Sequence, residues 1–368
     1  MPPGRRLELH RRRAVVALLL LILLCLQLML VAVRRHTIRS SPNAWWQAQD
    51  AAPPPSSNVT VNLVVASLRK DDISWTSKLR IPNLEVVRYI SDFDEGTADF
   101  HHPPVPRKGR EATIYHTYFH DFYDRLPDVS IMIHAHENPW HIEAILQQSM
   151  LFTLSHLDLE HVRRRGYANL RILWENACPF WLNTTKTPEE SDKKEEPFMR
   201  AAFAANFDMS AAQVPELLGG TCCSQFAVSR DAVHRHPREQ YARNRNWLVT
   251  TSWPDYISGR TWEHMFPWLF KGEASDCPGE WEAYCAMYHV CFDGQDEVDD
   301  YNRLWKEKEE LKECTEFPKE ILDLQAGLSA RRRMEEIRAI LEGYLRAALE
   351  RGKDEGIRHQ ATRELFGP

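Results

Sequence analysis

One long apolar segment near the N-terminus constrains the organisation of everything after it. Residues 14–33 read AVVALLLLILLCLQLMLVAV, with Gln27 as the only strongly polar side chain. A helix needs about 20 such residues to cross a lipid bilayer. A secretory signal core is shorter and ends at a small-residue cleavage site, for which the sequence offers no convincing candidate. We therefore predict an uncleaved membrane anchor, with a cleaved signal peptide as the alternative.

Arginine flanks this segment on both sides, with the larger group before it. The flanking arginines are Arg5, Arg6, Arg11, Arg12 and Arg13 on the N-terminal side, and Arg34, Arg35 and Arg39 on the C-terminal side. Their excess before the anchor favours a cytosolic N-terminus. The sequence thus predicts a single-pass type II protein of the Golgi or endoplasmic reticulum, with the lipid bilayer as its partner through residues 14–33.

The rest of the chain divides by composition. The predicted parts are a cytosolic tail (1–13), the anchor (14–33), a polar, Pro-rich stem (34–57), a lumenal α/β domain (58–275) and a charged helical extension (276–368). Two N-glycosylation sequons agree with a lumenal body. They begin at Asn58 and Asn183, and glycosylation requires exposure to the secretory lumen.

Cysteine usage fits an oxidising compartment, which permits disulfides. Seven cysteines follow the anchor: Cys178, Cys222, Cys223, Cys277, Cys285, Cys291 and Cys314. Because the number is odd, at least one thiol is free or pairs with another chain. We predict at least one disulfide from Cys277, Cys285 and Cys291, which are close in sequence. Cys222 and Cys223 are adjacent and would face opposite sides of a strand, so we do not expect them to pair with each other.

Charge and motifs exclude several classes of function. The chain has a formal net charge of −6 although its first 39 residues are strongly basic, so the body is more acidic still. An acidic body argues against binding to nucleic acid. The sequence contains no P-loop, no dinucleotide-binding glycine motif, no nucleophile elbow and no kinase signature.

Strand and helix patterns alternate through the body. We expect strands at 59–67, 84–90, 129–133, 171–174 and within 217–230, and helices at 111–126, 142–157, 235–249 and 258–272. This order predicts βαβ units and a mostly parallel central sheet sandwiched by helices.

An apolar stripe marks the C-terminal extension from Ser329 onward. Its members are Met334, Ile337, Leu341, Tyr344, Leu345 and Ala348. The spacing predicts a helix that packs on the body or on a partner. Self-association through this helix remains open, although the stripe is short for a coiled coil.

Residues 62–271 resemble an uncharacterised, largely fungal family, the domain of unknown function 3431. The matching pieces are VVAS followed by DDISW, then KGREATIYHTYFHDFYDRLPDVSIMIHAHENPWH, CCSQFAVSR, HPREQYARNRNWL and SGRTWEHMFPWLF. Five separated motifs in one order make the match specific, but the family supplies no function.

A second resemblance is to the A-type glycosyltransferases, which have an α/β sandwich with a nucleotide-binding half. Many are Golgi proteins with a short tail, one anchor and a stem. This resemblance implies a glycosyltransferase that moves a sugar from a nucleotide-sugar to a glycan or protein acceptor, with a divalent metal such as manganese. Those enzymes carry Asp-x-Asp at a strand end, where this chain reads His-Ala-His. The departure motivates the alternative of a non-catalytic lumenal binding protein.

Polar side chains crowd the end of the strand predicted at 129–133. His134, His136, Glu137 and His141 follow it within eight residues. Imidazole and carboxylate suit a divalent metal, so His134, His136 and Glu137 form a candidate metal set. His136 and Glu137 are also candidate catalytic groups. Alternatively, the imidazoles contact a diphosphate directly, or are only polar groups in a loop.

Substrate contacts are expected from the same edge of the sheet, because ligands bind beyond the carboxyl ends of strands in open α/β sheets. The candidates for substrate binding are Asp71, Asp72, Trp75, Lys108, Arg110, His134, Trp140, His141, Arg230 and Arg260. Lys108 and Arg110 lie just before the helix predicted at 111–126, and they would add to the attraction of its N-terminus for anions. Asp72 has the alternative role of a helix cap through Ser74.

Glu263 is the third candidate catalytic residue. It lies on the helix predicted at 258–272, one turn after Arg260. Its carboxylate is a candidate general base for an acceptor hydroxyl. The alternative is a salt bridge between Glu263 and Arg260.

Overall fold

The computed structural model describes Gln27 and residues 58–94, 100–315 and 324–366. The chain divides into two compact units, Met1–Asp50 and Ala51–Pro368, and the fold below is that of the second unit. Among the described residues, no helix combines the length and the apolar character needed to cross a membrane. The predicted tail, anchor and stem lie outside the described residues, apart from Gln27.

A five-stranded sheet forms the centre of the fold. Its strands are β1 (Val61–Ser67), β2 (Leu84–Ile90), β3 (Val129–His134), β4 (Tyr167–Asn169) and β7 (Phe226–Ser229). The strand order is β2-β1-β3-β7-β4. The strands β1, β2 and β3 are parallel, whereas β7 is antiparallel to both β3 and β4. The predicted α/β class is confirmed, but the sheet is mixed rather than mostly parallel.

The segment between residues 217 and 230 explains this correction. It was predicted as one strand, but it forms β6 (Leu217–Gly220) and β7, with Thr221–Gln225 between them. Cys223 and Ser224 have positive φ angles of 88° and 49°, which interrupt the extended backbone. The chain enters β7 at the edge where β3 ends, so β7 runs back along β3. The strand β6 joins a small second sheet with β5 (Leu182–Asn183) and β8 (Ser275–Asp276).

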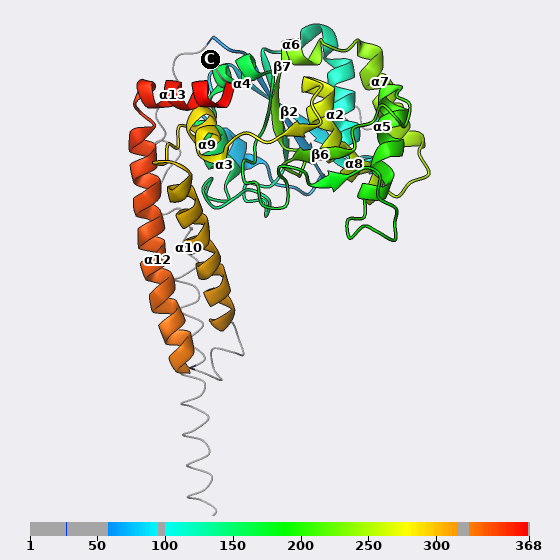
Figure 1. The fold of residues 1–368 in the computed structure, drawn as a ribbon. Helices are drawn as coiled ribbons and strands as arrows, with labels where there is room; N and C mark the ends of the chain where they lie inside the picture. Colours follow the sequence, from blue (N-terminus) through cyan, green and yellow to red (C-terminus); the bar gives the residue numbers. More distant parts are fainter. Residues whose placement is uncertain (1–26, 28–57, 95–99, 316–323, 367–368) are drawn as a thin grey trace, which may run out of the picture. The chain divides into compact units, whose positions relative to one another are not determined.

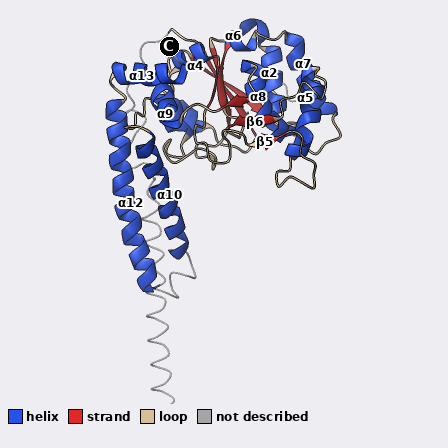
Figure 2. Ribbon diagram, in the orientation of Figure 1, coloured by secondary structure: helices blue, strands red, loops and turns tan. Residues whose placement is uncertain are grey.

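Helices cover both faces of the central sheet (Figures 1 and 2). One face carries α2 (Arg110–Asp121), α5 (Met199–Phe207), α7 (Arg238–Thr250) and α8 (Asp255–Lys271). The other carries α3 (Met150–His156), α4 (Leu159–Arg165) and α9 (Glu280–Tyr288). The first face holds an aromatic core that includes Tyr115, Phe226, Trp262, Phe266 and Phe270. Shorter helical segments are η2 (Ser74–Lys78), η3 (Tyr123–Arg125), η4 (Glu196–Phe198) and α6 (Arg230–Val233).

Two predicted elements on the second face are wrong. The helix expected at 142–157 is helical only over α3, because Gln147 and Gln148 have positive φ angles and Ser149 caps a new start by accepting from the Phe152 N–H. The strand expected at 171–174 does not form, since its backbone N–H groups bond to side chains instead of a neighbouring strand. The Ile172 N–H donates to the Glu143 carboxylate, and the Trp174 N–H donates to the Glu280 carboxylate.

The C-terminal extension is helical, as predicted. It contains α10 (Gln295–Cys314), α12 (Leu324–Arg351) and α13 (Glu355–Phe366). The helices α10 and α12 pack against each other, and α13 packs against α9. Four members of the predicted stripe are buried: Ile337, Leu341, Leu345 and Ala348.

Three disulfides form: Cys178–Cys277, Cys222–Cys223 and Cys285–Cys291. The predicted involvement of Cys277, Cys285 and Cys291 is confirmed, and Cys314 is a free thiol. The expectation that Cys222 and Cys223 do not pair is wrong. It assumed a strand, but the positive φ of Cys223 turns the backbone so that the two side chains meet.

Candidate active site

The order β2-β1-β3 creates a topological switch point. The chain leaves β1 for β2 on one side and later returns to β3 on the other side of β1. In open α/β sheets, such a point opens a crevice beyond the carboxyl ends of the two strands, and ligands bind there. The loop after β1 and the loop after β3 lie at this edge of the sheet, and both contain predicted site residues.

Side chains from the first loop reach the second. The Trp75 indole N–H donates to the Ala135 carbonyl at 2.8 Å, and the Trp75 side chain is buried. Lys78 Nζ lies 3.8 Å from Glu137 Oε2. The structure therefore holds the two loops together through Trp75 and Lys78, with the Trp75 ring as a buried support for the loop after β3.

The two aspartates of the first loop bond within their own loop. Asp71 Oδ2 accepts from the Leu68 N–H at 2.7 Å. Asp72 Oδ1 accepts from the Ser74 N–H at 2.8 Å, and this bond lowers the Asp72 pKa. The predicted contact between Asp72 and Ser74 forms, but Asp72 is not the cap of η2, because Ile73 is the N-cap residue and makes no side-chain cap hydrogen bond.

His134 and His141 form the centre of the site. Their ring centroids are 5.1 Å apart, in an edge-to-face arrangement. His134 Nε2 lies 3.1 Å from the Cys223 carbonyl, which only accepts hydrogen bonds, so this nitrogen carries the proton. The His134 N–H donates to Gln225 Oε1 at 3.2 Å. Burial and the nearby His134 lower the pKa of His141 to about 4, so His141 is neutral at pH 7.

Glu263 reaches the same place from α8. Its Oε2 accepts from the Cys223 N–H at 3.1 Å, so the Cys223 backbone is held between Glu263 and His134. Burial, followed by the negative charge of Glu111, raises the pKa of Glu263 to about 8. A carboxyl group with such a pKa is suited to proton transfer near neutral pH.

The predicted salt bridge between Arg260 and Glu263 does not form. Arg260 Nη1 pairs with Glu195 Oε2 at 3.4 Å, and His264 Nε2 lies 3.6 Å from the other oxygen of Glu195. Residues one turn apart on a helix share a side, but Glu195, the residue just before η4, competes for the Arg260 guanidinium. Glu263 is thus left to bond with the Cys223 backbone.

The N-terminus of α2 lies against the N-terminus of α8. Lys108 Nζ pairs with Asp255 Oδ1 at 3.2 Å and also contacts the Trp253 carbonyl at 3.4 Å. The aliphatic part of Arg110 lies over Gly259, where an added Cβ would come within 3.0 Å of Arg110 Cδ. The two predicted anion contacts are therefore on the α8 side of the site, and Lys108 already has an acidic partner.

Several predicted residues lie away from the cluster. Arg230 is at the opposite end of the sheet, where it pairs with Asp128 at 3.0 Å, because β7 runs antiparallel to β3. His136 is exposed. Trp140 is exposed as well, but its ring centroid lies 5.3 Å from that of His141, so Trp140 borders the cluster. No group of three or more His, Cys, Asp or Glu side chains could hold a metal ion within the part of the chain that the structure describes. The predicted set of His134, His136 and Glu137 is therefore not assembled as a metal centre.

Sequence reasoning missed two charged residues near His141, the buried Glu143 and the half-buried Arg171. Glu143 Oε1 accepts from the Ile172 N–H at 2.8 Å and from the Tyr284 hydroxyl at 3.1 Å, and burial raises the Glu143 pKa. Arg171 donates from Nη1 to the Cys222 sulfur at 3.4 Å. The available signal was a lone carboxylate in the apolar run Ile142–Leu146, where an unpaired charge is costly.

Comparison with known proteins gives a family match. A family model described as "Protein of unknown function (DUF3431)" matches residues 63–286, which is more than half of the chain. The match begins in β1 and ends in α9, so it includes the loops after β1 and β3 and also Glu263. No curated protein and no solved structure matches the chain.

Proposed function

The chain belongs to the DUF3431 family of proteins of unknown function, and we propose that it is a single-pass membrane glycosyltransferase of the Golgi type. It transfers a sugar from a nucleotide-sugar to a glycan or protein acceptor. The observation that carries this proposal is the convergence of His134, His141 and Glu263 at the carboxyl ends of β1 and β3. This is the position at which open α/β sheets hold nucleotides.

The proposed reaction assigns one role to each side of the site. The imidazoles of the β3 loop face the diphosphate of the donor. Glu263, in its carboxylate form, accepts the proton of the acceptor hydroxyl. The hydroxyl oxygen then bonds to the anomeric carbon of the donor, while the bond from this carbon to the diphosphate breaks and the nucleoside diphosphate leaves. Proton removal by a positioned carboxylate contributes about 10²- to 10⁴-fold to such reactions.

The proposed location is the Golgi or endoplasmic reticulum lumen. Three disulfides in the described chain are typical of proteins from oxidising compartments. Asn58 is exposed, so its sequon is accessible to glycosylation. The apolar segment at 14–33 supplies the proposed anchor.

Binding of the donor tests this proposal directly. The full-length chain is screened by thermal unfolding against nucleoside diphosphates and nucleotide-sugars. A true ligand at 100 times its Kd adds about 2.7 kcal/mol to the free energy of unfolding. His134→Ala combined with His136→Ala removes this stabilisation, whereas His359→Ala, at an exposed histidine of α13, retains it. Equal stabilisation of the double variant and the wild type contradicts the assigned site.

A second candidate function is non-catalytic binding in the lumen. It is favoured by Asp71, whose carboxylate bonds to the backbone of its own loop, and by Asp72, which does the same. Neither supplies the acid that A-type enzymes place near the donor. Release of nucleoside diphosphate from a bound nucleotide-sugar distinguishes the two functions, because a binding protein leaves the donor intact.

A further inference from the structure

A large cleft lies next to the candidate active site, between the second face of the body and α10. Its volume is about 900 Å³, within the range of about 300 to 1,000 Å³ typical of ligand sites. The body contributes the loop after β3 and the segment around Arg171, while α10 supplies the opposite wall. The wall from α10 lies outside the matched family region.

Three tryptophans line this cleft: Trp140, Trp174 and Trp305. Trp140 is 82% exposed, which is unusual for so large an apolar side chain. Trp305 is held under Lys308, whose Nζ lies 3.6 Å from the ring centroid. Exposed indole rings around one cleft offer flat apolar surfaces that a ligand can cover.

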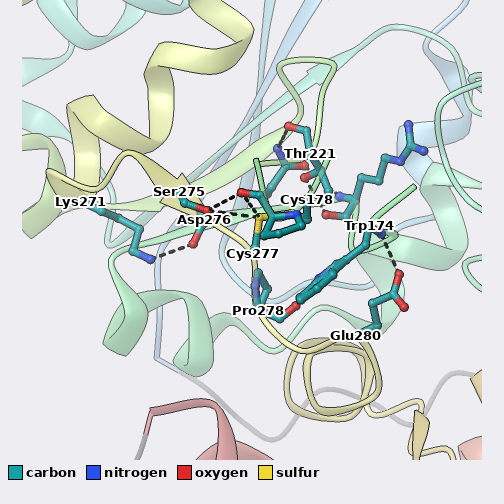
Figure 3. The surroundings of a disulfide bond; sticks show 12 residues. Trp174, Cys178, Thr221, Lys271, Ser275, Asp276, Cys277, Pro278 and Glu280 are labelled. Carbon is teal, nitrogen blue, oxygen red and sulfur yellow. Dashed lines mark hydrogen bonds and ion pairs between the residues drawn. A yellow bond between two sulfur atoms is a disulfide. The ribbon is translucent and has the colours of Figure 1, made fainter. Parts of the chain in front are cut away.

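Trp174 is fixed in place by the chain around a disulfide. Its indole N–H donates to the Pro278 carbonyl at 2.7 Å, and its backbone N–H donates to Glu280 Oε1 at 2.7 Å. The Cys178–Cys277 disulfide joins the two segments that make these contacts (Figure 3). Because its partners are covalently linked, the ring is held ready before any ligand arrives, which reduces the entropy lost on binding.

Two residues that line the cleft, Glu143 and Arg171, each have a polar atom without a hydrogen-bond partner in the described chain. Glu143 Oε2 and Arg171 Nε are buried, and neither has a hydrogen-bond partner within the described chain. The Glu143 residue is only 7% exposed. Buried polar groups are normally bonded, so these two atoms indicate a ligand that both donates and accepts hydrogen bonds.

Ion pairs among the residues of the cleft wall indicate which charge a ligand can carry. Glu175 is paired with Lys306 at 2.9 Å, and Glu307 is paired with Arg333 at 2.7 Å. These ion pairs neutralise part of the charge on the wall of the cleft. The acidic side chains that remain in the wall disfavour the binding of an anionic ligand. A neutral carbohydrate fits best, since its hydroxyls donate and accept hydrogen bonds while its C–H faces are apolar.

We infer that this cleft binds a neutral carbohydrate chain, which lies against Trp140 and Trp174 and bonds to Glu143 and Arg171. His141 also lines the cleft, and its ring lies beside that of His134 in the candidate active site. If the proposed function holds, the chain bound here is the acceptor, and its end lies next to the donor site. Carbohydrate binding itself does not depend on that function.

Calorimetric titration of the full-length chain with neutral oligosaccharides, without any nucleotide-sugar, tests the inference. Trp140→Ala is expected to weaken binding about tenfold, as is typical of a central aromatic contact. Trp140→Phe restores most of the affinity. Phe100→Ala changes nothing, because Phe100 is an exposed aromatic residue (56%) outside the cleft.

The outcomes separate this inference from the proposed function. Failure of every neutral oligosaccharide to bind the wild type overturns the cleft assignment, as does exclusive binding of cationic amino-sugar oligomers. Equal affinity of Trp140→Ala and the wild type also overturns it. The variant with His134→Ala and His136→Ala is expected to bind the oligosaccharide normally. Carbohydrate binding without any nucleotide-sugar binding therefore supports the cleft and contradicts the transferase.

Discussion

The surroundings stabilise a charged side chain at the amino end of β3 and destabilise charged side chains at its carboxyl end. At its amino end, Asp128 accepts from the Thr60 N–H at 2.9 Å and from the Thr60 hydroxyl at 2.8 Å, and it pairs with Arg230 at 3.0 Å. These contacts, the Thr60 N–H first, lower the Asp128 pKa. The charged form is therefore the stable form there, and the contacts serve the fold.

At the carboxyl end of β3, the surroundings disfavour charge. Burial lowers the pKa of His141 and raises that of Glu263, so both are largely neutral at pH 7. Ser224 Oγ is buried there without a partner in the described chain. Natural proteins tolerate such costs mainly at functional sites. The comparison shows that one strand joins a closed structural end to an end suited to proton transfer and ligand contact.

The largest expected effect comes from a substitution of Glu263, and it tests whether the carboxyl end of β3 is suited to proton transfer. Glu263→Gln keeps the shape of the side chain but cannot accept a proton, so sugar transfer is expected to fall about 10²- to 10⁴-fold, or about 3 to 5 kcal/mol of activation free energy. In the wild type, the rate is expected to rise with pH up to about 8, because the carboxylate is the proposed active form of Glu263. Rates of nucleoside diphosphate release across pH check both statements.

Stability gives a separate readout for Glu263. Its raised pKa means that the native state retains a proton that the unfolded chain has lost between pH 4.5 and about 8. The free energy of unfolding therefore falls as pH rises through this window. Glu263→Gln should remove that slope, as measured by denaturant unfolding at several pH values. A slope unchanged by the substitution would show that Glu263 has an ordinary pKa.

The contrast between the two ends was only partly accessible from sequence. The run Val129–Ile133 is apolar throughout, so the sequence predicts β3 and the polar cluster after it, and the bounds of β2 match the predicted strand at 84–90. Arg230 was assigned to the wrong end because the direction of β7 depends on a long-range strand pairing. No local pattern reports whether a strand pairs parallel or antiparallel with a distant one.

Side-chain partners were harder to predict for the same reason. The pairing of Arg260 with Glu195, 65 residues away, depends on where η4 lies in the fold. The role of Glu143 depends on Ile172 and Tyr284, which come from two other segments. Helical spacing gave the correct face for Glu263 but could not exclude Arg260 as its partner.

The next prediction concerns Asp128, at the amino end of β3. Asp128→Ala removes two hydrogen bonds to a charged acceptor, and we expect the free energy of unfolding to fall by about 2 kcal/mol at pH 7. Because the Asp128 pKa is lowered in the fold, this contribution is present above pH 4 and is lost as pH falls below it. Thermal and denaturant unfolding measure the loss. Nucleotide-sugar affinity should be unchanged, and a large fall in affinity would show that the two ends are not separate in function.

The smallest expected effect concerns Thr60, which both bonds to Asp128 and completes a glycosylation sequon. The substitutions below separate these two roles. Asn58-Val59-Thr60 lies at the closed end, and the Thr60 hydroxyl also accepts from the Asp128 N–H at 2.9 Å. Asn58→Gln and Thr60→Ala both abolish glycan addition at this site, but only Thr60→Ala removes the hydrogen bonds to Asp128. We expect Thr60→Ala to lower the free energy of unfolding by about 1 kcal/mol and Asn58→Gln to change it by less than about 0.5 kcal/mol. Thr60→Ser retains both the sequon and the hydroxyl, so it should match the wild type in gel mobility and in stability. If Asn58→Gln destabilises the chain as much as Thr60→Ala does, the attached glycan, and not the bonding of Asp128, stabilises this end of the sheet.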